Sequence, residues 1–306
     1  MGAVDDFGGE FGGEFGGLLA FFFEGGEGLA LEFGELIGGE SGVESGIGEE
    51  IENFPGVFGE TGGEDADGIG ARGGLESHAD ACSGWCAATG IDVVAIAYRL
   101  APEHQHPAQL DDVQAAFAHL HAQGLRVIVG GDSAGGNLAA ALCLRQRAQG
   151  GAMPVGQLLI YPGLGGDTSR GSYVSNAFAP MLTTAESAMY FGLRTGGMDR
   201  DSASDPELMP LKAADFLGMP PAFVVTADID PLRDDGRIYA ERLQADGVAA
   251  SYRNEPELVH GYLRARHMSH RAAASFAAMG EALVQLAEGC KIGKPNWIAS
   301  LRSQRV

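Results

Sequence analysis

Residues 127–142 read VIVGGDSAGGNLAAAL, and this stretch decides the fold. Its β-branched start predicts a buried strand, and Asn137–Arg147 predicts a helix. Between them stands a G-x-S-x-G pentapeptide, residues 131–135. A sharp strand-to-helix turn of this kind strains the backbone of its serine and exposes the hydroxyl at the start of the helix. The stretch therefore predicts a nucleophile at Ser133, with the Ala134 N–H placed to hold an oxyanion.

Strand and helix patterns alternate on both sides of this stretch. Short apolar runs predict strands at Ile91–Ala97, Arg126–Gly130, Gln157–Tyr161, Ala222–Thr226 and Ala249–Arg253. Helical spacing predicts helices through residues 110–120, 137–147, 238–245 and 271–288. The alternation predicts an α/β fold with a mostly parallel sheet and helices on both faces. Ligands of such sheets bind beyond the carboxyl ends of the strands.

A serine nucleophile needs a base, and three histidines follow Ser133: His260, His267 and His270. His260 comes soon after the strand predicted at residues 249–253, so it can reach the carboxyl edge of the sheet. His267 and His270 flank the terminal helix, where solvated side chains are expected. His260 is therefore the predicted base.

The acid that orients the base is expected after the strand Ala222–Thr226. Four aspartates qualify by position: Asp228, Asp230, Asp234 and Asp235. Pro231 keeps the residue before it in an extended turn, which favours Asp230. Asp234 and Asp235 are better placed to begin the next helix and favour its dipole. Asp230 is the predicted acid, and Asp228 is the alternative.

Four motifs in this order resemble the hormone-sensitive-lipase branch of the α/β-hydrolase esterases. They are YRLAPE (98–103), GDSAGGNLAAAL (131–142), DPLRDDG (230–236) and HGY (260–262). The resemblance covers about residues 73–289. It implies a carboxylesterase acting on short-chain acyl esters, with Ser133, Asp230 and His260 as the triad. It also implies that residues 98–103 form a structural corner, and that residues 165–215 form part of a cap over the acyl pocket.

The chain departs from this family before residue 73. Family members carry a His-Gly-Gly-Gly motif whose N–H groups form most of the oxyanion hole, but Ala66-Asp67-Gly68-Ile69 stands at the corresponding place. Gly68 can still offer an N–H, whereas Asp67 would repel the developing anion. The first strands and the N-terminal cap helices also lack a recognisable counterpart. We therefore expect a sheet that is incomplete or irregular at its N-terminal strands, with an exposed edge.

Composition changes at the same boundary. The 306 residues carry a net charge of -21, yet residues 1–74 hold 17 acidic side chains, one basic side chain and 24 of the 48 glycines. The predicted organisation is an atypical Gly/Glu/Phe-rich segment (1–72), a catalytic domain (73–289) and an appended tail (290–306). Our hypothesis is that a frame error or an artificial replacement put residues 1–72 in place of the usual cap and first strands.

The acidity and the absence of long apolar runs exclude several classes of function. Like charge disfavours nucleic acid and anionic membranes. The longest apolar run before residue 75, Leu18–Phe23, is too short to span a bilayer, and no basic residue precedes it, so neither a membrane span nor a signal peptide is expected. The four cysteines form no C-x-x-C pair and indicate buried thiols in a reducing cytoplasm. His104-Gln105-His106 is interpreted as a structural turn, so no metal and no cofactor are expected.

The expected partner is a small-molecule ester, and two copies of the chain are expected to pair as a homodimer. Two other functions stay open. The missing glycine motif favours a catalytically impaired hydrolase fold that binds small apolar ligands. The same serine chemistry also allows acyl transfer to an alcohol in place of water.

Overall fold

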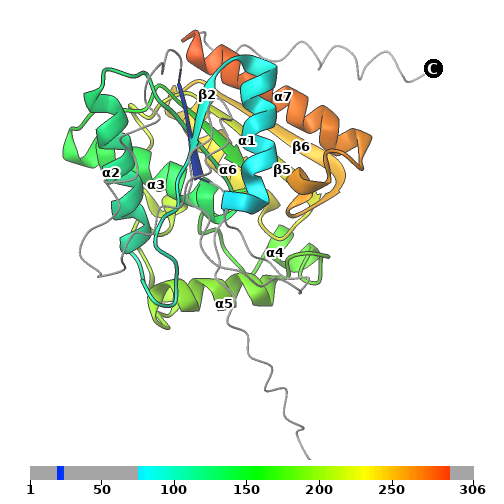
Figure 1. Cartoon of the computed structure of the whole chain (residues 1–306). Coiled ribbons are helices and arrows are strands. Elements are labelled where there is room, and N and C mark those ends of the chain that lie inside the picture. Colours follow the sequence, from blue (N-terminus) through cyan, green and yellow to red (C-terminus); the bar gives the residue numbers. More distant parts are fainter. Residues whose placement is uncertain (1–18, 24–74, 290–306) are drawn as a thin grey trace, which may run out of the picture.

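The computed structural model of the chain describes residues 19–23 and 75–289. Six strands form one sheet in the order β2-β1-β3-β4-β5-β6, and helices cover both of its faces (Figure 1). The strands are β1 (Leu19–Phe23), β2 (Asp92–Ala95), β3 (Ile128–Asp132), β4 (Gly156–Ile160), β5 (Ala222–Ile229) and β6 (Ala250–Val259). The helices are α1 (Leu75–Thr89), α2 (Ala108–Ala122), α3 (Ala134–Gln149), α4 (Ser172–Ser175), α5 (Thr184–Thr195), α6 (Arg233–Ala245) and α7 (His270–Ala287). The α/β prediction is confirmed.

The strands from β3 to β6 are parallel, as the alternation of strands and helices predicts. Their side chains alternate between two cores. One core lies under α2, α3 and α6 and includes Val129, and the other lies under α1 and α7 and includes Ile128. Because strands buried on both faces carry apolar residues on both sides, these segments read as continuous apolar runs. All five strands predicted after residue 75 are present.

The last strand is longer than predicted. β6 continues to Val259 instead of ending at Arg253, because it pairs with the long β5 as far as Ile229. The register between the two strands shifts near Ala227, and Glu257 has a positive φ of 61°. Pro256 is accommodated because β6 is an edge strand of the described sheet. His260 therefore follows a strand directly, without an intervening loop.

No element was predicted in residues 1–65, and for residues 19–23 this expectation is wrong. β1 lies between β2 and β3 and is antiparallel to both, so Phe21 pairs with Val94 on one side and with Val129 on the other. All five residues are buried. A run without glycine can bury side chains on both faces of a sheet, which the surrounding glycine-rich sequence cannot. The antiparallel β1 makes the N-terminal side of the sheet irregular, as expected. The rest of residues 1–74 lies outside the described residues.

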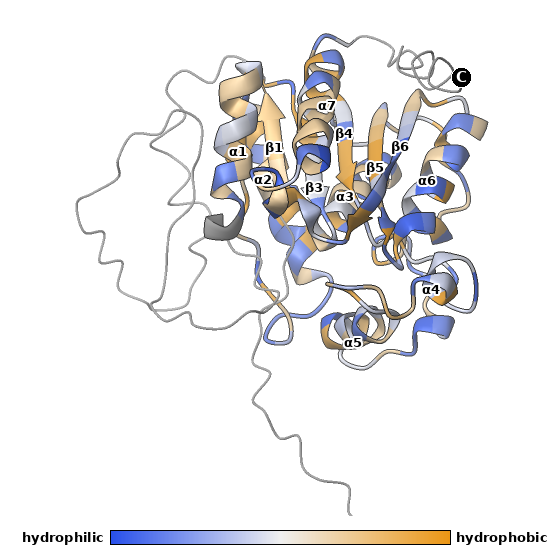
Figure 2. Cartoon of the chain, turned by 90° about the vertical axis from the view of Figure 1, so that its right-hand side faces the viewer, coloured by the Kyte–Doolittle hydropathy of each residue, from blue (hydrophilic) through white to orange (hydrophobic). Residues whose placement is uncertain are grey.

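Residues 165–215 leave the sheet beyond the carboxyl ends of the strands, where α4 and α5 lie (Figure 2). Thr183 and Glu186 form a capping box at the start of α5. Two hydrogen bonds tie this segment to the loop after β5: the Ser172 hydroxyl donates to the Pro231 carbonyl at 2.7 Å, and the Asn176 side chain donates to the Asp230 carbonyl at 3.1 Å. Within the described part of the chain, no helix is long and apolar enough to cross a membrane.

Candidate active site

The turn between β3 and α3 holds Ser133 in a strained conformation. Its φ is 54° and its ψ is -114°, which places it in the positive-φ region that L residues rarely adopt. The Ser133 N–H donates to the Ile160 carbonyl at 2.9 Å, and its carbonyl accepts from the Asn137 N–H at 3.1 Å. A Cβ at Gly136 would lie 2.9 Å from the Pro162 Cβ, so this turn has no room for a larger residue there. The backbone on both sides thus fixes the Ser133 side chain at the sheet edge.

His260 reaches the serine from the end of β6. Its Nε2 lies 2.9 Å from the Ser133 Oγ, and its Nδ1 lies 2.7 Å from the Asp230 Oδ2. A carboxylate only accepts, so this hydrogen-bond pattern assigns the ring proton to Nδ1 and leaves Nε2 to accept the serine proton. The His260 side chain is 12% exposed and Asp230 is fully buried, so little water competes for these contacts.

The loop after β5 aims one carboxylate at His260. The second oxygen of Asp230 accepts the Leu232 N–H at 2.8 Å, which fixes the plane of the carboxylate. Asp228 turns away and accepts from Arg233 at 3.3 Å and from Asn254 at 3.1 Å. Of the four candidates, Asp230 is the one that the structure brings to the histidine.

The other two aspartates hold the backbone of the segment that leaves the sheet. Asp234 accepts the Ser172 N–H at 3.0 Å, and Asp235 accepts the Leu164 N–H at 2.7 Å. Both lie in the first turn of α6, as predicted. Of the other two candidate histidines, His267 contacts Asp80 and His270 is the first residue of α7. The structure thus separates these residues from Ser133.

The charges around His260 favour its protonated form. Burial lowers the pKa of His260, but the charge and the hydrogen bond of Asp230 outweigh this effect, and Asp132 adds to it. Arg264 acts in the opposite direction, and the net result is a raised pKa. A base of this kind can take up the serine proton and keep it while the transition state forms.

A family model of the α/β hydrolase fold matches residues 68–264. The chain belongs to the α/β-hydrolase fold family. This hydrolase is 41% identical over 199 residues to carboxylesterase NlhH of Mycobacterium tuberculosis, and the match covers 62% of both chains. It is 39% identical over 245 residues to the carboxylic ester hydrolase LipN of the same organism, which covers 76% of the hydrolase and 60% of LipN. The hydrolase thus spans less than two thirds of the length of either relative.

Solved structures agree with this assignment. The esterase of Pyrobaculum calidifontis superposes on the hydrolase with a TM-score of 0.64 at 30% identity, covering 71% of the hydrolase and 73% of that chain. A bacterial heroin esterase superposes with a TM-score of 0.66 at 29% identity, covering 71% of each chain. The predicted resemblance to this family and the predicted fold are confirmed.

The two predicted oxyanion donors differ in what is known of their place. Ala134 is the first residue of α3 in the hydrolase, where backbone N–H groups have no partner within the helix. Its N–H and the positive end of the helix dipole favour a negative charge beside Ser133. Gly68 lies outside the described residues, as does the whole segment 66–69.

Two residues at the site carry no motif signal. Tyr161 directly follows β4, and its ring centroid lies 4.7 Å from that of His260. Asn176 binds the carbonyls of both Asp228 and Asp230, at 3.0 and 3.1 Å. The position of Tyr161 after a strand could have placed it at this edge of the sheet. Asn176 comes from the distant segment 165–215, and no sequence pattern links it to the loop after β5.

The YRLAPE segment of the hydrolase anchors α2 and does not reach the serine. Arg99 pairs with Asp112 at 2.7 Å, and the Arg99 N–H donates to the same carboxylate at 2.8 Å. In the neighbouring turn, His106 lies 3.2 Å from Asp205. No group of three or more metal-binding side chains occurs among residues 19–23 and 75–289.

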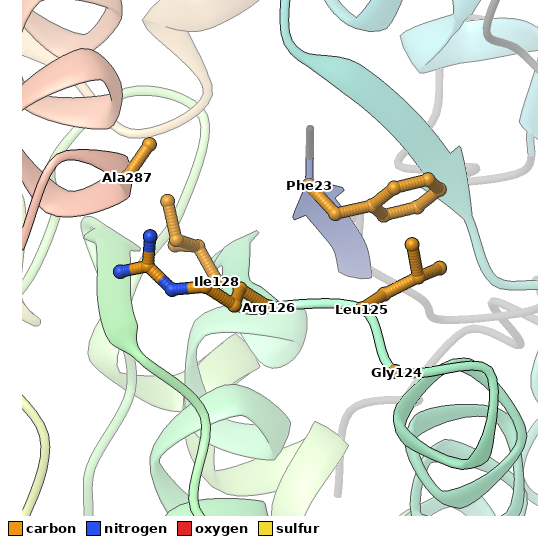
Figure 3. Close-up of a pocket in the computed structure, with 6 residues that line it drawn as sticks. All are labelled: Phe23, Gly124, Leu125, Arg126, Ile128 and Ala287. Atoms are coloured by element: carbon orange, nitrogen blue, oxygen red, sulfur yellow. The ribbon is translucent and has the colours of Figure 1, made fainter. Parts of the chain in front are cut away.

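A pocket of about 180 Å³ lies at the other end of the sheet (Figure 3). Phe23, Leu125 and Ile128 line it together with Gly124, Arg126 and Ala287. Ile128 begins β3, whereas Ser133 follows the end of this strand, five residues or about 16 Å further along. This pocket is therefore separate from the Ser133 site.

Proposed function

We propose that the chain is a serine carboxylesterase that hydrolyses short-chain acyl esters. The observation that carries the proposal is the hydrogen-bonded series Ser133–His260–Asp230, with contacts of 2.9 and 2.7 Å. Support for the reaction class comes from the relatives named as carboxylesterases and carboxylic ester hydrolases. A relative named ethyl acetate hydrolase, 32% identical over 223 residues, supports a small acyl group.

In the proposed reaction, the Ser133 Oγ bonds to the ester carbonyl carbon while its proton passes to the Nε2 of His260. The electron pair of the carbonyl moves onto its oxygen, and the Ala134 N–H stabilises the charge. The pair then returns, the bond from carbon to the alkoxy group breaks, and the alcohol leaves with the proton from Nε2. Ser133 now carries the acyl group.

The second half of the reaction repeats these steps with water. Water loses a proton to Nε2 and attacks the acyl carbon, and the bond to Ser133 Oγ breaks as the carboxylic acid leaves. The proton on Nε2 returns to Oγ, which regenerates the enzyme. Asp230 stays ionised throughout and stabilises the imidazolium that forms twice per turnover.

Hydrolysis of p-nitrophenyl esters tests the proposal. The full chain should release p-nitrophenolate from the acetate and butyrate esters faster than from long-chain esters. Ser133→Ala should fall to the background rate, while Ser169→Ala, at an exposed serine, should keep full activity. Mass spectrometry after a rapid acid quench should find the acyl group on the peptide that contains Ser133.

Equal rates for the chain and for Ser133→Ala would overturn the esterase proposal and favour the impaired hydrolase that binds apolar ligands. That result would assign the loss to the oxyanion hole, because losing one such donor costs about 10²–10³-fold in turnover. Added alcohol distinguishes hydrolysis from acyl transfer, since transfer would yield a new ester. The cytoplasmic location and the homodimer stay predictions.

A further inference from the structure

Asp132, the residue before the nucleophile, is a buried carboxylate that the proposed mechanism does not use. The residue is 5% exposed. Its Oδ2 accepts the Tyr161 hydroxyl at 2.8 Å, and its Oδ1 lies 3.4 Å from the Nε2 of His78, which is 2% exposed. A carboxylate in such surroundings costs free energy to bury, so its presence beside Ser133 calls for a physical explanation.

Tyr161 links this carboxylate to the base. Its backbone has a positive φ of 34°, and its N–H donates to the Val225 carbonyl at 2.7 Å, so the sheet holds it in a strained conformation. Its hydroxyl is on Asp132, and its ring packs against His260 at 4.7 Å between centroids, tilted by 57°. The ring of Tyr262 packs edge-on against Tyr161 at 5.3 Å. The Tyr161 side chain therefore has a single position between Asp132 and His260.

His260 thus lies near two carboxylates that arrive from different strands. Asp230 comes from the end of β5 and Asp132 from the end of β3. Both act on the imidazole through a buried environment, where charges interact more strongly than in water. Of the opposing groups, Arg264 faces His260, while His78 and Cys82 face Asp132 from α1. Two carboxylates against one guanidinium leave a net attraction for an imidazolium.

We propose that Asp132, fixed by the Tyr161 hydroxyl, is a positioning residue: it acts as a second carboxylate that stabilises the His260 imidazolium formed during ester hydrolysis. The inference rests on the proposed function for its role in turnover. Its physical content, the effect of one buried carboxylate on the protonation of one imidazole, can be measured without any substrate.

The direct test is an NMR titration of the full-length protein. His260→Gln assigns the His260 signal among the eight histidines. In Asp132→Asn, which keeps the size of the side chain and an oxygen for the Tyr161 hydroxyl, the titration midpoint of His260 should fall by about one pH unit. Tyr161→Phe removes the hydroxyl but leaves the Asp132 charge, so it should not lower the midpoint.

Asp215→Asn is the matched control for loss of one negative charge. Asp215 is exposed and pairs with Arg147 near the far end of α3. The start and the end of this helix are about 20 Å apart. The control should leave the midpoint of His260 unchanged. Asp132→Ser, a smaller neutral variant, repeats the measurement if the asparagine variant does not fold.

An unchanged His260 midpoint in a folded neutral variant at position 132 would overturn the proposal. A fall of the same size in Tyr161→Phe would also overturn it, because the effect would then come from ring packing and not from charge. Where the protein turns over esters, the acid limb of kcat/KM should move down in pH together with the NMR midpoint. An NMR shift without esterase activity would refute the proposed function and leave the electrostatic coupling established.

Discussion

At the scale of single residues, the site depends on how two neighbouring turns are held. Ser133 and Tyr161 each follow a strand, and each has a positive φ, at 54° and 34°. The two strained positions persist because the sheet satisfies their backbone groups: Ser133 donates to Ile160, and Tyr161 donates to Val225. Strain held in this way places side chains where relaxed turns would not.

The residue-scale geometry predicts a large effect for Asp230→Asn. An amide at this position can reverse the hydrogen bond to Nδ1 and place the proton on Nε2, where it blocks proton transfer from Ser133. We expect kcat/KM for p-nitrophenyl acetate to fall by about 10⁴-fold, with the loss in kcat. Asp228→Asn, two residues away and turned from the histidine, should change kcat/KM by less than about three-fold. Similar losses in both variants would contradict the assignment of Asp230.

The protonation of His260 predicts the pH dependence of both activity and stability. Its pKa is raised above the ordinary value because Asp230 outweighs the effect of burial. Catalysis needs the neutral base, so activity should rise as pH increases through a midpoint above about 6.5. A raised folded-state pKa contributes stability below about 6.5, and this contribution is lost as pH rises through the folded-state value.

Two measurements check this. The pH profile of kcat/KM gives the midpoint of the acid limb directly. Urea unfolding of the chain and of His260→Gln, from pH 5.5 to 8.5, should show that the chain loses part of its advantage over the variant as pH rises. An acid limb centred below the ordinary histidine value would show that the two carboxylates do not outweigh burial.

At the scale of elements, α6 joins the strand ends to the segment 165–215. Asp235 in its first turn accepts three hydrogen bonds on Oδ2: from the Leu164 N–H at 2.7 Å, the Gly166 N–H at 3.2 Å and the Tyr173 hydroxyl at 3.0 Å. Burial raises the pKa of Asp235 to about 6, although these donors lower it in part. One side chain thus fixes the loop after β4 and the α4 region together.

Replacing this carboxylate predicts a loss of stability. Asp235→Ala leaves buried donors without an acceptor and should lower the free energy of unfolding by about 3 kcal/mol. Asp235→Asn keeps an acceptor and should lose less. Because the folded-state pKa is raised, the chain should lose stability relative to Asp235→Asn between pH 5.5 and 7.5, as the buried carboxyl ionises. Urea unfolding at both pH values measures this, and an opposite slope would refute the raised pKa.

At the scale of the whole molecule, β1 connects the two halves of the sheet and both cores. Phe21 contacts Phe117 on the α2 side at 6.1 Å between ring centroids. Phe22 contacts Trp85 on the α1 side at 5.6 Å, and Trp85 stacks on Phe276 of α7 at 5.0 Å. A strand of five residues from an otherwise glycine-rich segment thus contributes side chains to both layers.

Phe22→Ala tests the contribution of β1 to the fold. Removal of a phenyl ring that is 1% exposed should lower the free energy of unfolding by about 3–5 kcal/mol, through lost burial and the cavity left behind. Phe178→Ala, at a ring that is 94% exposed, is the matched control and should change it by less than about 0.5 kcal/mol. Equal unfolding midpoints in urea for the two variants would contradict the placement of β1 in the sheet.

The sequence by itself determined the parallel strands, the Ser133 turn and the choice of His260 as the base. These features depend on short-range patterns: apolar runs, the glycines around one serine, and the order of motifs along the chain. Such patterns act locally and can be recognised in any short window of sequence.

Only the tertiary structure decided the place and direction of β1, the extension of β6, and the positions of Tyr161 and Asn176 beside the triad. It also decided that Asp230 faces His260 while Asp228 turns to Arg233, since the two aspartates differ in sequence only by their distance from Pro231. Each of these features depends on contacts between segments far apart in the chain. Pairing and packing between such segments depend on the shape of the assembled sheet, which no local pattern contains.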